Sequence, residues 1–436
     1  MKLSLRCRRQ SFVYFLKERK AELPMKKYVF AGASQRALKM FCKPMLADYP
    51  DILKVCGVYD INYGRAKTFA AEAGASFAAY EDFDVMLATE KPDFVIVTTV
   101  DVYHAEYIIR SLEAGCDVIT EKPMTTRDDL CRNILEAEKR TGHKVIVTFN
   151  YRYAPFMTKV KELIVSGAIG DVYSVHFEWL LTRNMALEGH GASYFRRWNA
   201  RMEKSSGLLV HKSTHHFDLV NWWLGQRPEK VSAFAKLNLY GAKNSPYADV
   251  PAPGLRCANC PHAKECQFFY KPDEFEERFY IANESYDGYM KDNCVYAADI
   301  DIYDTMAVNV QYNKGAMLTY SLNATAMYEG WHCVINGSKG RLEIHNYEQG
   351  IDKKPENHIR LYDLNNNVTD FAIGRAGGGH GGGDVRLRNM LFLDNIPDPL
   401  GHAAGTADGA YSILVGVAAN KSIKSGEIVC IEDLLK

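Results

Sequence analysis

The sequence predicts an α/β chain of two domains: a doubly wound parallel sheet with helices on both faces, then an α+β domain with a large, mostly antiparallel open sheet. Three observations predict this fold class. A chain of 436 residues is too long for one ordinary core. Its first third alternates short apolar, β-branched runs with amphipathic segments, which is typical of βαβ units. The remainder contains longer alternating segments, which are typical of antiparallel strands.

The predicted elements follow one another in the order that a parallel sheet requires. Strands are expected at residues 28–31, 53–59, 94–97, 117–120 and 145–148, with helices at 105–114 and 127–140 between them. This gives a first domain of residues 25–149, preceded by an extension of residues 1–24. The second domain, residues 150–436, has predicted strands at 172–181, 302–312, 316–324 and 332–336. One face of its sheet should stay open to subunit contacts.

Composition excludes several classes of partner. Lys plus Arg and Asp plus Glu both number 53, and no basic block stands out, so the charge pattern of a nucleic-acid-binding protein is missing. No apolar run approaches the roughly 20 residues that cross a bilayer, and the N-terminus lacks the features of a signal peptide. We therefore expect a cytoplasmic protein with a small, neutral partner and without nucleic-acid or membrane contacts.

A glycine-rich turn follows the first predicted strand. The run Gly32-Ala-Ser34-Gln35-Arg36-Ala37 has the spacing of the G-x-G-x-x-G motif, with Ser and Ala at its second and third glycine positions. Asp60 ends the second strand, where a carboxylate accepts hydrogen bonds from ribose hydroxyls and repels a 2′-phosphate. The pattern predicts a Rossmann domain that prefers NAD to NADP. The alternative interpretation is a plain turn and a capping aspartate.

A second group of motifs carries a family resemblance. Glu121-Lys122-Pro123 ends the fifth strand and follows the segment VIVTTVDVYHAEYIIRSLEAGCDVIT; Asn150-Tyr151-Arg152 opens the second domain, and ARMEKSSGLLVHKSTHHFDLVNWWLG and GHGGGD lie within it. Together these segments resemble the Gfo/Idh/MocA oxidoreductases over nearly the whole chain from Met25. The resemblance implies an NAD cofactor, hydride transfer with a sugar, sugar acid or cyclitol, and a homo-oligomer joined through the sheet.

Ligands of a Rossmann sheet lie beyond the carboxyl ends of its strands, where Thr98, Thr99 and Lys122 fall. A lysine there can bind the reacting oxygen and, if its pKa is lowered, exchange a proton with it. The resemblance implies that Glu121 orients a cofactor ribose and that a rigid, cis Pro123 aims the lysine inward. The expected cofactor-binding residues are Gly32, Ser34, Gln35, Arg36, Asp60, Thr98, Thr99, His104, Glu121, Lys122 and Asn150.

A histidine-rich segment is expected to begin a helix that runs to Trp223. On such a helix His211 and His215 share one face, as do Lys212 and His216. A zinc motif of the H-E-x-x-H type is disfavoured, because Lys212 stands where that motif has its glutamate. His215 matches the family histidine that works with the lysine, whereas His211 replaces a residue that is often acidic. The predicted catalytic residues are Lys122, His215, His211 and Lys212; His216 is equally consistent with a core residue.

Several polar and aromatic residues of the second domain suit a sugar. Aromatic rings stack on sugar rings, and cationic groups bind hydroxyls; the candidates are Trp179, Arg183, Tyr194, Arg196, Arg197 and Trp198. His380, in the glycine-rich stretch before a helix that Asp384 begins, either reaches the substrate or caps a turn.

Four of the 11 cysteines have the short spacings of a metal site, within a predicted insertion near residues 251–294. In a cytosolic chain, Cys257, Cys260, Cys266 and Cys294 favour one structural Zn²⁺ at a site separate from hydride transfer. An iron–sulfur cluster and four unrelated thiols are the alternatives.

Three functions remain open at this point. The first is an NAD-dependent dehydrogenase or reductase acting on CH–OH groups. The second is a redox-neutral enzyme that cleaves glycosides with tightly bound NAD, which the unusual His211 leaves open. The third, a non-catalytic NAD-binding regulator, is disfavoured because Lys122 and His215 are retained.

Overall fold

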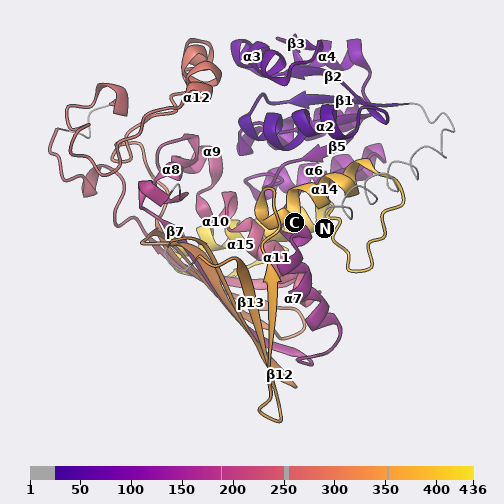
Figure 1. Cartoon of the computed structure of the whole chain (residues 1–436), viewed down its shortest axis with the longest axis vertical. Helices are drawn as coiled ribbons and strands as arrows, with labels where there is room; N and C mark the ends of the chain where they lie inside the picture. Colours follow the sequence, from indigo (N-terminus) through magenta and orange to yellow (C-terminus); the bar gives the residue numbers. More distant parts are fainter. Residues whose placement is uncertain (1–24, 188, 250–254, 351–352) are drawn as a thin grey trace, which may run out of the picture.

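The computed structural model describes residues 25–187, 189–249, 255–350 and 353–436, and it contains two sheets with their helices (Figure 1). The predicted N-terminal extension, residues 1–24, lies outside the described residues. Among the helices of the described ranges, none is both long enough and apolar enough to span a membrane.

The first sheet is parallel throughout and has the strand order β3-β2-β1-β4-β5-β6. This order is that of a Rossmann fold, so the predicted fold class is confirmed. The strands are β1 (Lys26–Ala31), β2 (Leu53–Tyr59), β3 (Ala78–Tyr80), β4 (Phe94–Val97), β5 (Asp117–Thr120) and β6 (Val145–Val147). Sequence analysis missed β3, because its three residues are too few to show a pattern.

Helices connect these strands and lie on both faces of the sheet. They are η1 (Ala37–Cys42), α2 (Lys43–Asp48), α3 (Tyr63–Ala73), α4 (Phe83–Glu90), η2 (Asp101–Tyr103), α5 (His104–Glu113) and α6 (Asp128–Thr141). In α6 the buried residues recur at the spacing of one helix face, Cys131, Ile134 and Ala137, and left-handed Gly142 ends the helix.

The second sheet has nine strands in the order β14-β13-β12-β11-β7-β10-β9-β8-β15. Only β7 and β10 pair in parallel, which confirms the prediction of a mostly antiparallel sheet. Its strands are β7 (Val172–Thr182), β8 (Pro228–Lys236), β9 (Thr305–Tyr312), β10 (Met317–Ala326), β11 (Glu329–Gly337), β12 (Gly340–Gln349), β13 (Glu356–Asp363), β14 (Val368–Gly374) and β15 (Val429–Cys430).

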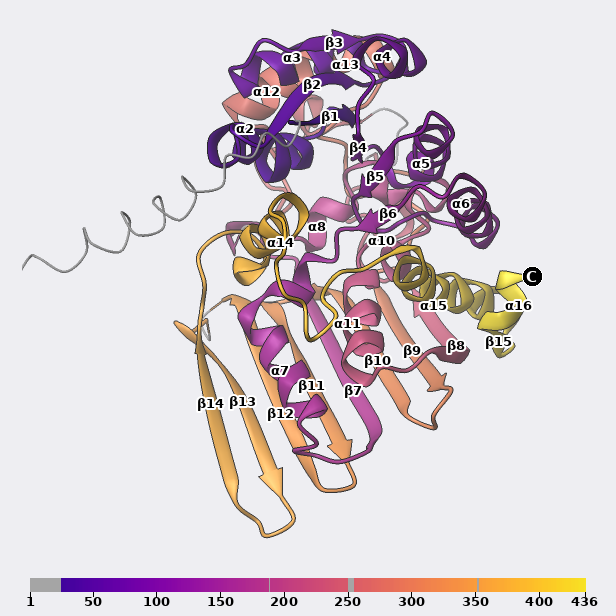
Figure 2. The ribbon, with the colours of Figure 1, turned by 90° about the vertical axis from the view of Figure 1, so that its right-hand side faces the viewer.

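One face of this sheet is covered by α7 (Pro155–Val165), α11 (Thr214–Leu224) and α15 (Thr406–Ser425) (Figure 2). Burial alternates along β9, as expected when helices cover one face of a sheet: Val308 and Val310 are buried, while Asn309 and Gln311 are exposed. The remaining helices are η3 (Asn150–Tyr153), η4 (Met185–Leu187), α8 (Gly191–Tyr194), η5 (Trp198–Ala200), α9 (Met202–Ser205), α10 (Leu208–His211), η6 (Ala242–Asn244), η7 (Cys257–Asn259), α12 (Glu274–Phe279), η8 (Ile281–Asn283), α13 (Glu284–Asp287), η9 (His380–Gly382), α14 (Gly383–Phe392) and α16 (Ile431–Leu435).

The prediction of a single helix from His211 to Trp223 is wrong. The chain forms α10, turns at Lys212 and Ser213, and then forms α11, so His211 and His215 lie on different helices. The buried hydroxyl of Ser213 accepts a hydrogen bond from Tyr320, and that of Thr214 bonds to Ser412. Both hydroxyls at the break between the two helices thus bond to side chains of other elements.

The insertion between β8 and β9 reaches across to the nucleotide-binding domain, where α12 lies beside α3 (Figures 1 and 2). The Asn62 amide donates to the Asn283 carbonyl at 2.8 Å, and Arg65 pairs with Asp287 at 2.9 Å. A side chain at Gly64 would begin 2.4 Å from Asn283 Oδ1. The insertion therefore packs tightly against the edge of the first sheet.

The core of the nucleotide-binding domain also contains residues from much later in the chain. Phe279 of α12 and Leu387 and Phe392 of α14 belong to the same buried cluster as Phe30 and Phe69. The Phe392 ring also packs edge-on against a ring of the first strand. Thus two segments of the second half complete the first domain.

Candidate active site

The turn after β1 brings the ends of β1 and β4 into close contact. Gly32 has φ +104°, and its N–H donates to the Tyr59 carbonyl at 2.8 Å. A Cβ atom at Gly32 would lie 2.6 Å from the backbone nitrogen of Thr99. The Thr98 hydroxyl donates to the Gly32 carbonyl at 2.7 Å. Only glycine fits this turn, as the nucleotide-binding motif requires.

Ser34 and Gln35 of the motif form hydrogen bonds with other residues of the protein. Ser34 Oγ accepts the N–H of Ala37 at 3.0 Å and so caps the following helix. The N–H of Gln35 donates to the hydroxyl of Tyr280 at 3.1 Å. Since Tyr280 belongs to the insertion, the insertion contacts the turn that is predicted to bind the cofactor.

Asp60 lies at the carboxyl end of β2 and is 8% exposed. Its carboxylate accepts the N–H groups of Ala33 at 2.7 Å and Asn62 at 2.8 Å, and it pairs with Arg65 at 2.8 Å. Burial raises the pKa of Asp60, and Arg65 opposes that effect. Since a carboxylate has about four acceptor positions, these three bonds leave room for one more donor, such as a ribose hydroxyl.

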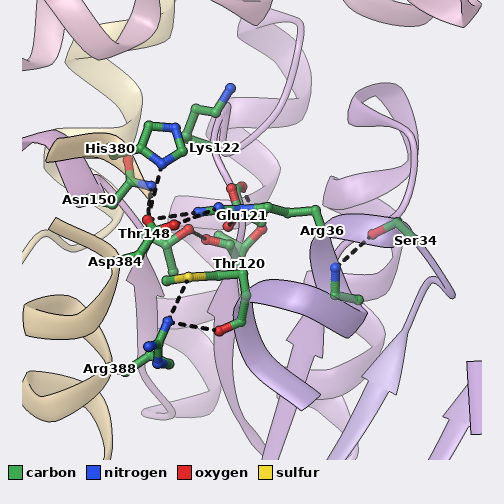
Figure 3. A network of polar contacts seen from close by, with 12 residues as sticks. Ser34, Arg36, Thr120, Glu121, Lys122, Thr148, Asn150, His380, Asp384 and Arg388 are labelled. Carbon is green, nitrogen blue, oxygen red and sulfur yellow. Dashed lines mark hydrogen bonds and ion pairs between the residues drawn. The ribbon is translucent and has the colours of Figure 1, made fainter. Parts of the chain in front are cut away.

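A buried network joins the cofactor turn to the second domain (Figure 3). Arg36 pairs with Glu121 at 2.9 Å and with Asp384 at 3.0 Å. Asp384 also accepts from the amide of Asn150 at 2.6 Å and lies 3.1 Å from Nδ1 of His380. Burial is the largest influence on Asp384, yet these partners hold its pKa below the ordinary range. The network fixes the glycine-rich loop beside the ends of β1 and β5.

The Lys122–Pro123 peptide bond is cis, as the resemblance implies. His104, predicted as a cofactor-binding residue, lies behind this bond: its Nδ1 is 2.8 Å from the Pro123 carbonyl and its Nε2 is 3.1 Å from the Thr99 carbonyl. Both ring nitrogens are thus engaged by backbone. This geometry makes His104 a support for the lysine turn.

Lys122 is partly buried, and its ammonium donates to the backbone carbonyl of His211 at 3.2 Å. Figure 3 shows its side chain extending away from the Asp384 network, beside His380. Burial, followed by the positive charge of Lys212, lowers the pKa of Lys122 to about 8. A lysine with such a pKa is partly neutral near physiological pH and can accept a proton.

His211 pairs with a carboxylate that sequence analysis missed. Its Nδ1 lies 2.5 Å from Oδ2 of Asp101, a residue that is 3% exposed and begins η2, after β4. Tyr194 and Trp198 contact the His211 ring edge-on. Burial lowers the pKa of His211 well below its usual value and raises that of Asp101. Asp101 follows Thr99 in the sequence by two residues, so its strand-end position was the available signal.

His215 is 1% exposed, and neither ring nitrogen has a hydrogen-bond partner within the described part of the chain. Its ring stacks on Tyr151 with centroids 4.5 Å apart and lies 5.7 Å from the ring of His380. Burial lowers the pKa of His215 strongly, with Lys122 as the next cause. Since buried polar groups normally have hydrogen-bond partners, these two ring nitrogens are available to bind a polar ligand.

The other members of the histidine segment have different surroundings. Lys212 is 7% exposed and lies over the ring of Trp179, 5.1 Å from its centroid. His216 packs against Phe177 and Trp179, and its Nδ1 is 3.2 Å from the Tyr320 hydroxyl. The positive charge of Lys212 also lowers the pKa of Lys122, so the two lysines lie near each other, whereas His216 lies in the core of the second domain.

Two predictions about the second domain require correction. Arg196 does not face a sugar, because its guanidinium bonds to the Phe268 carbonyl at 2.6 Å and to Cys257 Sγ at 3.1 Å. The zinc prediction is not supported either. No three His, Cys, Asp or Glu side chains of the described residues converge closely enough to hold a single metal ion.

Comparisons with known proteins agree with this architecture. The model of the NAD-binding Rossmann fold of the GFO/IDH/MocA oxidoreductases matches residues 26–149, and that of the family's C-terminal alpha/beta domain matches residues 161–431. YteT of Bacillus subtilis, a protein named only as an oxidoreductase, is 39% identical over 432 residues, which cover 94% of this chain and 99% of YteT.

Two further proteins are similar to this chain, one in part of its sequence and one in its fold. Inositol 2-dehydrogenase 2 of Saccharopolyspora erythraea is 31% identical over 42% of this chain and 49% of its own length. The WlbA dehydrogenase of Bordetella pertussis, solved with NADH and UDP-GlcNAcA, has the same fold, with a TM-score of 0.61 and 18% identity over 93% of this chain and 99% of its own. Fold, sequence matches and lysine turn agree, and the chain belongs to the Gfo/Idh/MocA family of oxidoreductases.

Proposed function

We propose that the protein is an NAD-dependent oxidoreductase that transfers a hydride between nicotinamide and a hydroxyl or carbonyl of a sugar, sugar acid or cyclitol. One observation carries the proposal. Lys122, with its lowered pKa, stands at the carboxyl end of β5 near His215, whose two buried nitrogens have no partner among the described residues. This pair combines a proton acceptor with an unsatisfied polar group.

The residues around the glycine turn fit a dinucleotide. Gly32 leaves no side chain between the turn and β4, Asp60 retains one acceptor position, and the Oδ1 atom of buried Asn150 has no partner within the described residues. Gly32, Asp60, Thr99 and Glu121 would hold NAD, which supplies the hydride acceptor when bound. The cofactor ribose would compete with Arg36 for Glu121.

The chemistry of this chain's residues then follows from their protonation. In the direction of oxidation, the neutral amine of Lys122 accepts the proton of the substrate hydroxyl while the hydride leaves the carbon that bears this hydroxyl. His215 stays neutral because of its lowered pKa and binds the reacting oxygen through a ring nitrogen. In the direction of reduction, the ammonium of Lys122 returns the proton to the carbonyl oxygen.

His211 and Asp101 act as positioning residues for the lysine. The His211 carbonyl accepts from Lys122, and Asp101 fixes the His211 ring from the opposite domain. Asp101→Asn keeps the shape of the side chain but removes its charge. It should lower kcat, leave NAD affinity unchanged, and move the pH midpoint of activity; a purely structural role would lower thermal stability instead.

A substrate panel tests the proposed function. Purified protein with NAD and candidate sugars, sugar acids and cyclitols should produce NADH, followed by its absorbance. Lys122→Ala and His215→Ala should each lower kcat by about 10² to 10⁴ with little change in NAD affinity. Near-normal turnover by Lys122→Ala would contradict the assignment. Release of an aglycone without net NADH formation would favour the redox-neutral glycosidase instead.

The open face of the second sheet supports a homo-oligomer. Tyr173 of β7, Phe234 of β8 and Met317 of β10 are large apolar residues that are more than half exposed, at 58%, 78% and 59%. Exposed apolar side chains on a sheet face suit contact with a second copy. Light scattering should give a mass of at least twice 49.2 kDa, and Phe234→Glu should lower it. A monomeric wild-type protein at micromolar concentration would contradict this part of the proposal.

A further inference from the structure

The second sheet carries charged groups beside His215 that the proposed proton transfer does not use. Tyr151, whose ring stacks on His215, donates its hydroxyl to Oε1 of Glu348 on β12 at 3.4 Å. Lys212 lies over the ring of Trp179 on β7. Strand β11 pairs with both β7 and β12, so the ends of β7 and β12 that carry Trp179 and Glu348 are close together (Figure 2). The sheet therefore forms a charged wall beside the proposed catalytic histidine.

Lys212 has no anion of its own. The residue is 7% exposed, and within the described residues its ammonium forms neither a hydrogen bond nor an ion pair. Its charge acts on Glu329 and Glu348, yet it pairs with neither of them. A buried ammonium is costly without hydrogen-bond acceptors, and all three of its donors remain for a ligand.

Glu329 is balanced inside the protein. It is 1% exposed, and its carboxylate accepts the N–H groups of His190 at 2.7 Å and Thr182 at 3.3 Å and pairs with the His190 ring. Burial is the largest influence on this carboxyl, yet His190 holds its pKa below the ordinary value. Glu329 therefore keeps a negative charge in the wall.

Glu348 has one oxygen left for a ligand. Its Oε1 accepts from Tyr151 and from the amide of Asn346 at 3.1 Å, whereas its Oε2 has no hydrogen-bond partner in the described part of the chain. Asn346 is 4% exposed, and its own Oδ1 lacks a partner there as well. Burial, followed by the charge of Glu329, raises the pKa of Glu348, so a hydrogen-bond donor from a ligand would stabilise its carboxylate.

The wall thus offers a free donor and a free acceptor. A hydroxyl both donates and accepts hydrogen bonds, so a polyhydroxy ring satisfies both groups. A substrate carboxylate would meet the charges of Glu329 and Glu348, and an amino group would meet those of Lys122 and Lys212; like charges at such distances cost several kcal/mol. Building on the proposed function, we propose that Lys212 and Glu348 bind two hydroxyls of a neutral sugar or cyclitol, in addition to the hydroxyl that reacts.

This proposal gives Lys212, a predicted catalytic residue, a role in substrate recognition. Lys122 and His215 bind the reacting oxygen, and two further hydroxyls held on the wall would fix the reacting carbon in one position. Such a site rejects analogues strongly, because an analogue that lacks a hydroxyl leaves a buried polar group unpaired. The substrate class narrows accordingly from sugars, sugar acids and cyclitols to the neutral compounds.

A substrate panel for the full chain tests this charge preference. The panel contains neutral sugars and cyclitols, their uronic acid and amino counterparts, and deoxy analogues that each lack one hydroxyl. With NAD saturating, the best neutral compound should have a kcat/KM at least about 100-fold above those of its acidic and amino counterparts. Two of its deoxy analogues should each lose at least about 100-fold as well.

Two variants connect these hydroxyls to their partners. At pH 9, where the proton of Lys122 no longer limits the rate, Lys212→Met and Glu348→Ala should each raise KM at least about 10-fold and leave NAD affinity unchanged. In each variant one deoxy analogue should become as good a substrate as its parent, because hydroxyl and partner are then both absent. Glu343→Ala is the matched control: this glutamate of β12 pairs with Arg341, and the variant should keep the wild-type constants.

Two results would overturn the inference while the proposed function stands. The first is a kcat/KM for a uronic acid or amino sugar that equals or exceeds that of its neutral counterpart. The second is the same loss for every deoxy analogue in the variants as in the wild type. NADH formation from no member of the panel would overturn the proposed function and this inference together. Should a variant fail to fold, the wild-type panel alone decides the charge preference.

Discussion

The lowered pKa of Lys122 gives the sharpest prediction, a pH profile for the oxidation reaction. With a pKa of about 8, about one lysine in eleven is neutral at pH 7. A lysine at its ordinary value of 10.5 would be neutral in about one molecule in 3,000, so burial and Lys212 increase the active form roughly 300-fold. Because the neutral amine accepts the proton, activity should rise with pH.

The assay is kcat/KM for oxidation between pH 6 and pH 10, with NAD saturating. The value should increase about 50-fold from pH 6 to pH 8 and level off above pH 9, whereas the reduction reaction should fall over the same range. Lys212→Met removes the neighbouring positive charge at similar size, so it should move the midpoint to higher pH. Lys122→Arg should be inactive, since a guanidinium does not lose its proton.

Lys161 provides a matched control. Burial lowers its pKa to about 8 as well, but it lies on α7, where it bonds to the Trp222 carbonyl. Lys161→Arg should therefore keep the wild-type profile. A profile that is flat, that has its midpoint near 10, or that moves in Lys161→Arg would refute the assignment of the proton acceptor to Lys122.

Three further predictions follow from the geometry. Gly32→Ala should abolish detectable NAD binding by calorimetry, because its Cβ would lie 2.6 Å from a backbone nitrogen at φ +104°; normal affinity would exclude the turn as the nucleotide site. Asp218→Ala should cost about 3 kcal/mol in denaturant unfolding, because it leaves buried Arg152 with the partly exposed Asp408 as its remaining carboxylate partner, and a loss below about 1 kcal/mol would contradict this. NADH should bind more tightly than NADPH in fluorescence titration because of Asp60; the reverse order would show that Arg65 decides the preference.

The first domain was predictable because its signals are local. Strands β2, β4 and β5 lie at the predicted residues, since a strand buried on both faces shows a continuous apolar run. Gly32 and Lys122 were likewise indicated by their places after strands. The family and the mostly antiparallel second sheet were also predicted, and both are confirmed.

The remaining features depend on contacts between distant residues. Nothing in the local pattern shows that Asp384 pairs with Arg36, or that Tyr280 contacts Gln35, because these partners are more than 200 residues apart. The break at Lys212 coincides with hydroxyl bonds to other elements, which helical periodicity does not encode. The roles assigned to individual site residues remain predictions that the proposed assays test.

The shared core of the first domain has a consequence for biosynthesis. The chain leaves the ribosome from its N-terminus, and the first sheet is complete in sequence at β6, yet Phe279 and Phe392 fill part of its core. Until about nine-tenths of the chain has been made, the apolar surface that Phe392 covers stays open to solvent or to other nascent chains. The protein should therefore depend on chaperones late in translation, and a fragment ending at residue 149 should aggregate.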